Sequence, residues 1–124
     1  MISMTIFEPG TVVDVPFPFI EQEKRKTRPA LILSSPSFQS SCGACVMAMI
    51  TSAERSTWPS DVLLADWRGA GLRKPSLLRW KIFTLDDALI MGARGALSPA
   101  DWTHVRASFE GIFTSKKSIN PKEH

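Results

Sequence analysis

Cysteine and histidine are scarce in this sequence, which leaves few ways to build a metal or redox site. The chain has only two residues of each kind among its 124. Cys42 and Cys45 form a single C-x-x-C, whereas a zinc site needs two further ligands, and His104 and His124 lack zinc-finger spacing. A thioredoxin-type pair should open a helix, yet residues 46–50 have the composition of a strand. We therefore expect two reduced thiols at a strand start and no metal or cofactor.

Long hydrophobic runs are also missing. No stretch of the sequence approaches the roughly 20 apolar residues that cross a bilayer as a helix. Residues 1–7 lack the basic flank and long apolar run of a signal peptide, and there are no internal repeats. These features predict a cytoplasmic protein that does not bind membranes. A chain of this length favours one domain, expected at residues 1–115, with a flexible polar tail at 116–124.

The sequence has a mild basic excess that is unevenly distributed. Its formal net charge is +3, with five Lys/Arg and seven Asp/Glu in residues 1–67 against ten and five in residues 68–124. Four of the five basic residues in the first part form one run, namely Lys24, Arg25, Lys26 and Arg28. A polyanion could lie between this run and the basic stretch at 68–81. Composition alone favours the simpler alternative of solvated surface charges.

Short apolar segments separated by polar turns predict a mainly β protein. Strands are expected at 12–19, 31–33, 46–51, 61–64 and 77–83, and loops or turns at 20–27, 34–43, 52–60 and 66–71. Pro16 and Pro18 lack a backbone donor, so their part of the first strand should lie at a sheet edge or at the strand's end. Apolar residues alternate with Arg79 and Lys81 in the last strand, so both cations should share one face.

The end of the chain carries the clearest signal for a helix. Ser98, Pro99 and Asp101 provide an N-cap, a proline at the first helical position and an acid in the first turn. Apolar residues then recur at helical spacing and should lie against the sheet, namely Trp102, Val105, Phe109 and Ile112. About five short strands followed by one helix suggest a small β-barrel.

Three segments in this order resemble the PemK/MazF family of toxin ribonucleases. The first joins Gly10-Thr11-Val12-Val13 and Pro16-Phe17-Pro18-Phe19 to Arg28-Pro29-Ala30-Leu31-Ile32-Leu33-Ser34. The second is Ile50-Thr51-Ser52, and the third runs from Lys74-Pro75-Ser76-Leu77-Leu78-Arg79 through Thr84-Leu85-Asp86 to Gly95-Ala96-Leu97-Ser98. Each is common alone, but the ordered set spans about residues 8–113 and best matches the branch with the Pro-Phe-Pro-Phe segment.

This resemblance implies both a fold and an activity. The implied fold is mainly β, an SH3-like barrel with a C-terminal α-helix, assembled as a homodimer. The implied activity is cleavage of single-stranded RNA at short sequences without metal, controlled by a cognate antitoxin that covers the substrate groove. The functional residues of the family correspond here to Arg28 and Thr51 and, in some members, to Ser52 and Arg79.

Metal-independent cleavage needs groups that stabilise negative charge on the phosphoryl oxygens as the 2′-hydroxyl attacks phosphorus. Arginine suits this because its planar, permanently charged group grips phosphate through two hydrogen bonds. We therefore assign Arg28 and Arg79 to the phosphoryl group, with Thr51 donating a hydrogen bond beside them. Residues expected to bind the rest of the RNA are Ser52, Lys24, Arg25, Lys26 and Lys81. The general base stays open between Glu21, Glu23, His104 and an arginine that has lost its charge. The histidine is expected to be structural, and the arginine would need a strong perturbation.

Three departures from the family pattern bear on activity. Thr11 replaces the acid that usually follows the first glycine, and Glu21, Gln22 and Glu23 stand where some members have a histidine. Lys81 occupies a position that is acidic in some members. The histidine and acid departures motivate a second hypothesis, a catalytically weakened module that binds antitoxin or nucleic acid without cutting.

Each candidate residue also has a structural interpretation. Arg28 could be a surface residue before a proline, and Thr51 and Ser52 could simply end a strand. Arg79 could pair with an acid across the sheet. Three tryptophans could stack on bases, although packing in the core or in a dimer is the favoured role of Trp58, Trp67 and Trp80. A generic SH3-like adaptor ranks last because such barrels usually display tyrosines, and this sequence has none.

Overall fold

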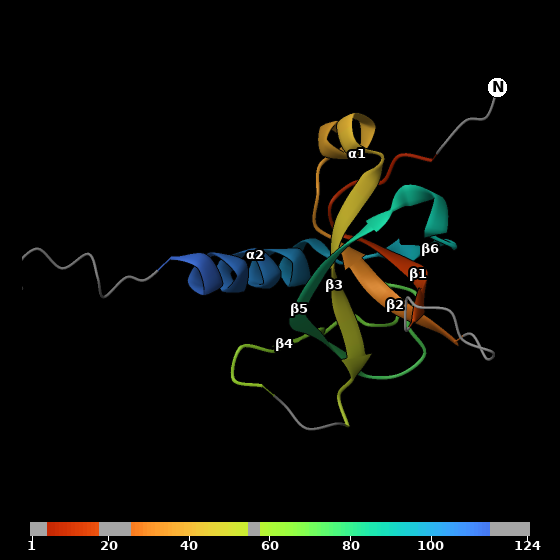
Figure 1. Ribbon diagram of the computed structural model, residues 1–124. Helices are drawn as coiled ribbons and strands as arrows, with labels where there is room; N and C mark the ends of the chain where they lie inside the picture. Colours follow the sequence, from red (N-terminus) through yellow and green to blue (C-terminus); the bar gives the residue numbers. More distant parts are fainter. Residues whose placement is uncertain (1–4, 18–25, 55–57, 115–124) are drawn as a thin grey trace, which may run out of the picture.

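The computed structural model describes residues 5–17, 26–54 and 58–114 (Figure 1). In these ranges six strands form one sheet in the spatial order β4-β5-β3-β2-β1-β6, and each neighbouring pair is antiparallel. In chain order the elements are β1 (Thr11–Phe17), β2 (Lys26–Ile32), α1 (Pro36–Cys42), β3 (Ala44–Ser52), β4 (Val62–Leu63), β5 (Ser76–Asp86), the 3₁₀ turn η1 (Asp87–Leu89), β6 (Gly92–Ala96) and α2 (Pro99–Phe113).

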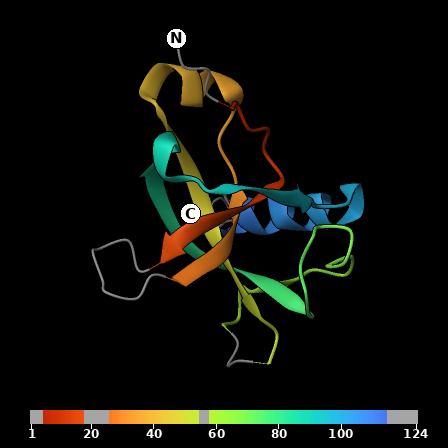
Figure 2. The ribbon, with the colours of Figure 1, turned by 90° about the vertical axis from the view of Figure 1, so that its right-hand side faces the viewer.

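The sheet curls into a half-barrel with α2 at its side, which confirms the predicted fold class (Figures 1 and 2). Alternate residues of the strands enter two hydrophobic clusters, as period-two patterning requires. Val12 and Leu31 belong to the cluster that includes Val105 of α2, whereas their neighbours Val13 and Ile32 belong to the other. The central strands are therefore buried on both faces.

The predicted strands are all present, but the sequence placed some of their limits wrongly. β2 begins at Lys26, inside the expected loop, because residues 26–30 pair with β1 from Phe17 to Val13. β6 was missed altogether. Its sequence, Gly-Ala-Arg-Gly-Ala, has no apolar alternation, and it is held as a strand by backbone pairing with β1. Because β6 is held by backbone hydrogen bonds to β1, its side chains need not alternate between apolar and polar, and the sequence pattern does not reveal it.

Pro16 lies at the end of β1, as its missing donor predicts. The pairing of β1 with β6 stops at Asp14 and Gly92, whereas the pairing with β2 continues past Pro16 to Phe17. No ladder bond to β6 is therefore lost at the proline. Pro18, the other proline of this segment, lies outside the described residues.

Residues 36–42, expected to be a loop, form the helix α1. The Ser35 hydroxyl accepts a hydrogen bond from the backbone N–H of Phe38, Pro36 occupies the first turn, and Gly43 ends the helix in the left-handed region at φ 68°. These are the same start and stop signals that identify the terminal helix. The serine-rich composition concealed them, and the buried Gln39 then ties α1 to Phe7 through a 2.9 Å hydrogen bond.

The terminal helix α2 begins where the sequence predicts, with Ser98 accepting from the backbone N–H of Asp101 at 3.1 Å. The apolar stripe is only partly covered. Val105 is buried, but Phe109 and Ile112 are 39% and 40% exposed because the second half of α2 extends beyond the sheet (Figure 1). The expectation that the whole stripe lies against the sheet is therefore wrong. Neither described helix has the length and apolarity that crossing a membrane requires.

The two cysteines occupy different elements. Cys42 is the exposed last residue of α1, and Cys45 is buried in β3, so only one of them lies at the start of a strand. Burial raises the pKa of the Cys45 thiol, a hydrogen bond with Ser34 opposes that rise, and the charge of Asp87 adds to it. Both are free thiols, and no cluster of three or more His, Cys, Asp or Glu suited to a metal occurs among the described residues.

Candidate functional site

A cleft of about 510 Å³ opens where β2, β3 and β5 meet the loop before β5. Six of its lining residues are cations, and within the described ranges no carboxylate belongs to the lining set. The cations come from four separate parts of the chain: Arg28, Arg73, Lys74, Arg79, Lys81 and Arg94. The remaining lining residues are Pro29, Met49, Ile50, Thr51, Ser52, Leu72 and Ser76. A concave surface with this charge attracts and concentrates an anionic ligand.

Neighbouring strands bring the three predicted catalytic residues to this cleft. β3 lies between β2 and β5, with Met49 opposite Ala30 on one side and opposite Arg79 on the other. Arg28 lies two residues before Ala30 and Thr51 two residues after Met49, so antiparallel pairing carries both in the same direction along the sheet. Arg28, Thr51 and Arg79 all line the cleft.

Arg79 forms a bidentate ion pair with Asp61, the residue before β4. Its Nε donates to Oδ1 at 3.1 Å and its Nη2 donates to Oδ2 at 2.8 Å. The pair is nearly enclosed, with side-chain exposures of 11% for Arg79 and 6% for Asp61. Of the interpretations that the sequence allowed for Arg79, pairing with an acid is therefore present in the structure. The same arginine still lines the cleft, so the pair forms part of its wall.

The ion pair shifts the ionisation of both partners. Burial alone would raise the pKa of Asp61, but hydrogen bonds from Arg79 and from the backbone N–H of Trp58, together with the arginine's charge, lower it below its ordinary value. The hydrogen bond to Asp61 in turn raises the pKa of Arg79, opposed by partial desolvation and reinforced by the carboxylate's charge. At neutral pH the wall of the cleft therefore holds a fully ionised pair.

This pair predicts a pH-dependent contribution to stability. Because the folded-state pKa of Asp61 is depressed, its stabilisation is present above the ordinary carboxyl pKa of 3.8 and is lost as the pH falls through the lower folded value. Asp61→Asn should therefore lower the urea midpoint relative to wild type at pH 7, with the difference shrinking near pH 3. The exposed Glu110→Gln is the matched control. A difference for Asp61→Asn that persists undiminished in acid would contradict the assignment.

Arg94, on β6, lines the cleft, although no motif or spacing in the sequence selects it. Its Nε donates to Asp14 Oδ1 at 2.6 Å and its Nη1 donates to the carbonyl of Gly71 at 3.1 Å. Gly71 has φ 81°, and a side chain there would meet the Arg94 backbone, which explains the glycine at this close approach. Only the unrecognised strand β6 brings residues 14, 71 and 94 together. Sequence spacing therefore carried no signal for this contact.

Four of the cleft cations are not neutralised by the described acids. Within the described ranges the ion pairs are Arg79 with Asp61 and Arg94 with Asp14. The cations without such a partner there are Arg28, Arg73, Lys74 and Lys81. This surplus of positive charge on a concave surface is the electrostatic pattern of a polyanion site.

Sequence comparison decides the family. The chain matches the sequence model described as "PemK-like, MazF-like toxin of type II toxin-antitoxin system" over residues 8–113. It belongs to this family. The match agrees with the resemblance drawn from the Arg-Pro-Ala-Leu, Ile-Thr-Ser and Lys-Pro-Ser segments. A separate comparison with curated protein sequences found no significant match.

Solved structures of PemK/MazF-like toxins share the fold. An endoribonuclease from a Mycobacterial species, solved in complex with its cognate antitoxin, has a TM-score of 0.67 at 16% identity, covering 87% of this chain and 93% of that one. A MazE-MazF structure from Deinococcus radiodurans gives 0.69 at 21% identity, covering 87% and 96%. The Mycobacterium tuberculosis toxin MazF-mt6 gives 0.64 at 17%, covering 83% and 95%. At these identities the likeness establishes the fold.

The other residues predicted for this PemK/MazF-like toxin are distributed unevenly. Ser52 and Lys81 line the cleft, whereas Lys26 is exposed on β2 and is not part of its lining. Lys24 and Arg25, predicted to bind RNA, lie outside the described residues, as do the candidate bases Glu21 and Glu23. His104 is exposed on α2 and does not line the cleft.

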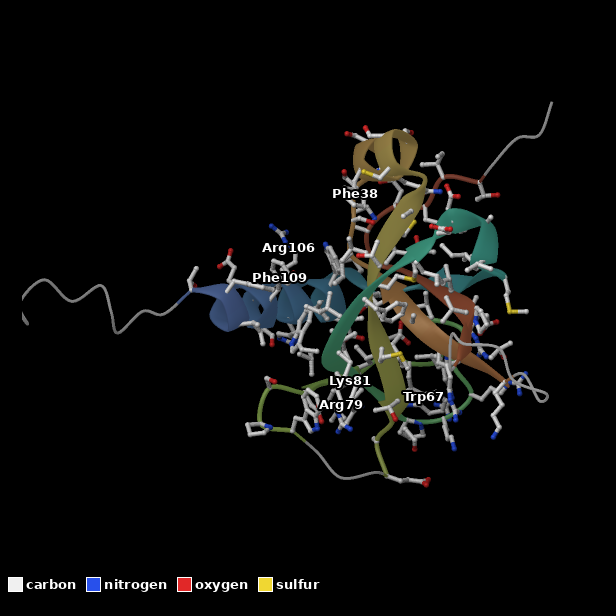
Figure 3. All side chains as sticks on the ribbon, viewed as in Figure 1. Phe38, Trp67, Arg79, Lys81, Arg106 and Phe109 are labelled. Carbon is white, nitrogen blue, oxygen red and sulfur yellow. The ribbon has the colours of Figure 1, made fainter. Side chains whose placement is uncertain are left out.

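The three tryptophans considered for base stacking have different environments in this chain. Trp80 is buried, and its Nε1 donates to the Ser108 hydroxyl of α2 at 2.9 Å, which confirms the expected packing role. Trp67 is half-buried against the core, with the Arg68 guanidinium 4.4 Å from its ring centroid. Trp58 is 39% exposed and lies beside the cleft cations. Figure 3 shows Arg79 and Lys81 together on β5, in the region that Trp58 contacts.

Proposed function

We propose that this chain is the toxin endoribonuclease of a type II toxin–antitoxin system, and that it cuts single-stranded RNA at short sequences without metal. The observation that carries the proposal is the cleft, where six cations and the hydroxyls of Thr51 and Ser52 line one concave surface. The family to which the chain belongs supplies the biological setting. Because bound RNA would be held chiefly through its phosphates, affinity should fall steeply with salt concentration.

The proposed reaction rearranges bonds within the RNA, while a general base takes the proton of the 2′-hydroxyl and a proton is returned to the departing 5′-oxygen. The 2′-oxygen forms a bond to the adjacent phosphorus, and the bond from phosphorus to the 5′-oxygen breaks. The products are a 2′,3′-cyclic phosphate and a 5′-hydroxyl. Arg28, which has no ion pair with the described acids, binds the phosphoryl oxygens through its guanidinium fork. Thr51 donates a hydrogen bond to them, and Arg79 adds a cationic group in the wall.

Flanking nucleotides are held by the remaining groups in this proposal. Ser52 and Lys81, which line the cleft, contact the phosphates on either side of the reacting one. Lys26 extends the basic surface along β2, and Lys24 and Arg25 are assigned to it from their place in the sequence. A cognate antitoxin inhibits the toxin by covering this same cleft in the cytoplasm. Complexes of related toxins with their antitoxins support that role.

The toxin is proposed to act as a homodimer. The second half of α2 exposes apolar side chains that its own sheet does not cover, with Phe109 39%, Ile112 40% and Phe113 62% exposed. Burial of such a surface between two protomers is favourable in proportion to the apolar area removed from water. Light scattering of the purified protein at micromolar concentration should give twice the chain mass of 13.7 kDa. A monomer under these conditions would count against the dimer.

A second candidate is a binding module of the same family that does not cut. The bidentate pair with Asp61 favours it, because the donors of Arg79 that would grip phosphate already bind a carboxylate. Such a module would keep the basic cleft and bind RNA or antitoxin through the cations that have no ion pair with the described acids. The two candidates differ in what happens to RNA after it binds.

Expression without an antitoxin separates the two candidates. The toxin should arrest growth, total RNA from the arrested cells should carry new 5′-hydroxyl ends, and Arg28→Ala at equal protein level should abolish both effects. Arg106→Ala, an exposed residue of α2 outside the cleft, is the matched control and should arrest growth like wild type. Normal growth and intact RNA with folded wild-type protein present would favour the binding module.

A further inference from the structure

Trp58 is the exposed member of the four tryptophans, and it lies over two cations of the cleft. Its ring centroid is 4.9 Å from the Arg79 guanidinium carbon and 5.7 Å from the Lys81 ammonium nitrogen. Trp80 is buried, and Trp67 and Trp102 are half-buried against the core. An indole that is 39% exposed at the margin of a basic cleft contributes little to the core. Its position therefore needs an explanation other than packing.

The backbone of Trp58 is fixed by the same carboxylate that pairs with Arg79. Asp61 Oδ2 accepts the backbone N–H of Trp58 at 2.7 Å, and the Asp61 N–H donates to the Trp58 carbonyl at 3.0 Å. Asp61 also holds Arg79 through two hydrogen bonds. One carboxylate thus binds both the backbone of Trp58 and the guanidinium that lies under its ring. These bonds hold the backbone of residue 58 beside the cleft, and the contacts with Arg79 and Lys81 place the ring over those cations.

A further contact ties this segment to α2. The Ser108 hydroxyl of α2 donates to the carbonyl of Ser60 at 3.4 Å and accepts from Trp80 Nε1 at 2.9 Å. Residues 58–61 are therefore attached to the helix as well as to β5. Because the backbone of this segment is already held in place, it loses little backbone entropy when a ligand binds beside it.

We propose that Trp58 forms a stacking subsite for one unpaired base of the RNA, and that Asp61 is the positioning residue that holds it there. This inference rests on the proposed function, since it needs RNA in the cleft. Basic grooves bind single strands by combining phosphate contacts with aromatic rings on which bases stack. Lys81, which has no ion pair with the described acids, supplies the charge beside the paired Arg79, while the exposed part of the indole supplies the apolar platform. The recognised group is a flat, unpaired nucleobase next to a bound phosphate.

The test compares two probes that carry the same charge. One is a randomised-sequence, fluorescently labelled 2′-O-methyl RNA, which binds but cannot be cut because its attacking hydroxyl is blocked. The other is an abasic oligomer of equal length. Trp58→Ala should weaken binding of the first probe about tenfold and leave binding of the second unchanged, since stacking contributes to the first alone. Trp58→Phe, which keeps a stacking ring, should retain most of the affinity. Because Asp61 binds the backbone of residue 58, these variants keep its anchoring hydrogen bonds.

The role of Asp61 is tested by the ratio of the affinities for the base-containing probe and the abasic probe. Asp61→Ala, which removes both acceptor oxygens, should reduce the preference for the base-containing probe toward that of Trp58→Ala. Binding of the abasic probe should stay equal to wild type or become tighter because a negative charge is removed. Circular dichroism confirms that each variant is folded. A merely structural role for Asp61 would weaken both probes together, and that outcome would overturn its assignment as a positioning residue.

The remaining outcomes distinguish failure of the stacking subsite from failure of the proposed RNA-cleaving function. If Trp58→Ala binds the base-containing probe as wild type does, while Arg28→Ala weakens both probes, the stacking subsite is overturned and the RNA cleft is retained. If Trp58→Ala instead alters the mass in solution without altering RNA affinity, Trp58 is a protein contact and the subsite is likewise overturned. If folded wild-type protein binds neither probe, the proposed function itself fails, and the subsite with it.

Discussion

Arg28→Ala should lower the single-turnover rate of RNA cleavage by about a hundredfold or more, which is the usual effect of removing one donor from a charge-stabilising site. Arg28 lies on β2 at the cleft, with no ion pair to the described acids. Its guanidinium is therefore available to grip the phosphoryl oxygens as negative charge develops on them. The measurement is cleavage of a labelled RNA with enzyme in excess, so that only the first turnover is observed.

Two companion variants show which property of Arg28 matters. Arg28→Lys keeps the charge but loses the two-donor geometry, so it should recover only part of the rate. Arg106→Ala removes the same charge from exposed α2 and should cleave at the wild-type rate (Figure 3). If Arg28→Ala weakened RNA binding but left the single-turnover rate at saturating enzyme unchanged, Arg28 would be a binding residue and not a catalytic one.

Asp101→Ala should destabilise the fold by about 2–3 kcal/mol, because its carboxylate satisfies backbone groups that alanine cannot reach. The side chain is 1% exposed in the first turn of α2. Its two oxygens accept from the backbone N–H groups of Ala65 at 3.0 Å and Asp66 at 2.9 Å. The carboxylate therefore links the helix to the segment between β4 and β5, which continues to Arg73 and Lys74 in the cleft. Urea unfolding monitored by circular dichroism measures the loss.

Glu110→Ala is the matched control for this prediction, since it removes an exposed acid from the same helix. It should change the free energy of unfolding by no more than about 0.5 kcal/mol. The free energy of unfolding of Asp101→Asn should lie between those of Asp101→Ala and Glu110→Ala, because the carboxamide keeps one acceptor oxygen of the original pair. Equal stabilities for Asp101→Ala and Glu110→Ala would show that the contacts with residues 65 and 66 contribute nothing to the fold.

The sequence predicted those parts of the fold that local chemistry determines. Ser98, Pro99 and Asp101 identified the start of α2 correctly because capping is a contact between near neighbours. Ser35 and Gly43 carry equivalent information for α1, which was missed because a serine-rich segment suggested a loop. The second half of α2 was wrongly placed against the sheet, since helical periodicity shows which face is apolar but not how far the sheet extends.

The sequence predicted which residues form the candidate site, but not the ion pairs that these residues make. Arg28, Thr51 and Arg79 were named from motifs, and the strand order brings them to one cleft. The pairing of Arg79 with Asp61 joins residues 18 positions apart, and that of Arg94 with Asp14 joins residues 80 apart. Contacts at such separations depend on strand register, which a single sequence does not display. The role of each residue in catalysis stays a prediction that the variants above address.

The most direct test of the central claim is incubation of a long single-stranded RNA with the purified protein in EDTA, followed by analysis of the new ends. Cleavage at a short recurring sequence, with 2′,3′-cyclic phosphate and 5′-hydroxyl ends, is the predicted result. Cleavage that needs added Mg²⁺ and leaves 3′-hydroxyl ends would contradict the metal-independent mechanism. Intact RNA across a broad set of substrates, with folded wild-type protein present, would contradict the nuclease itself.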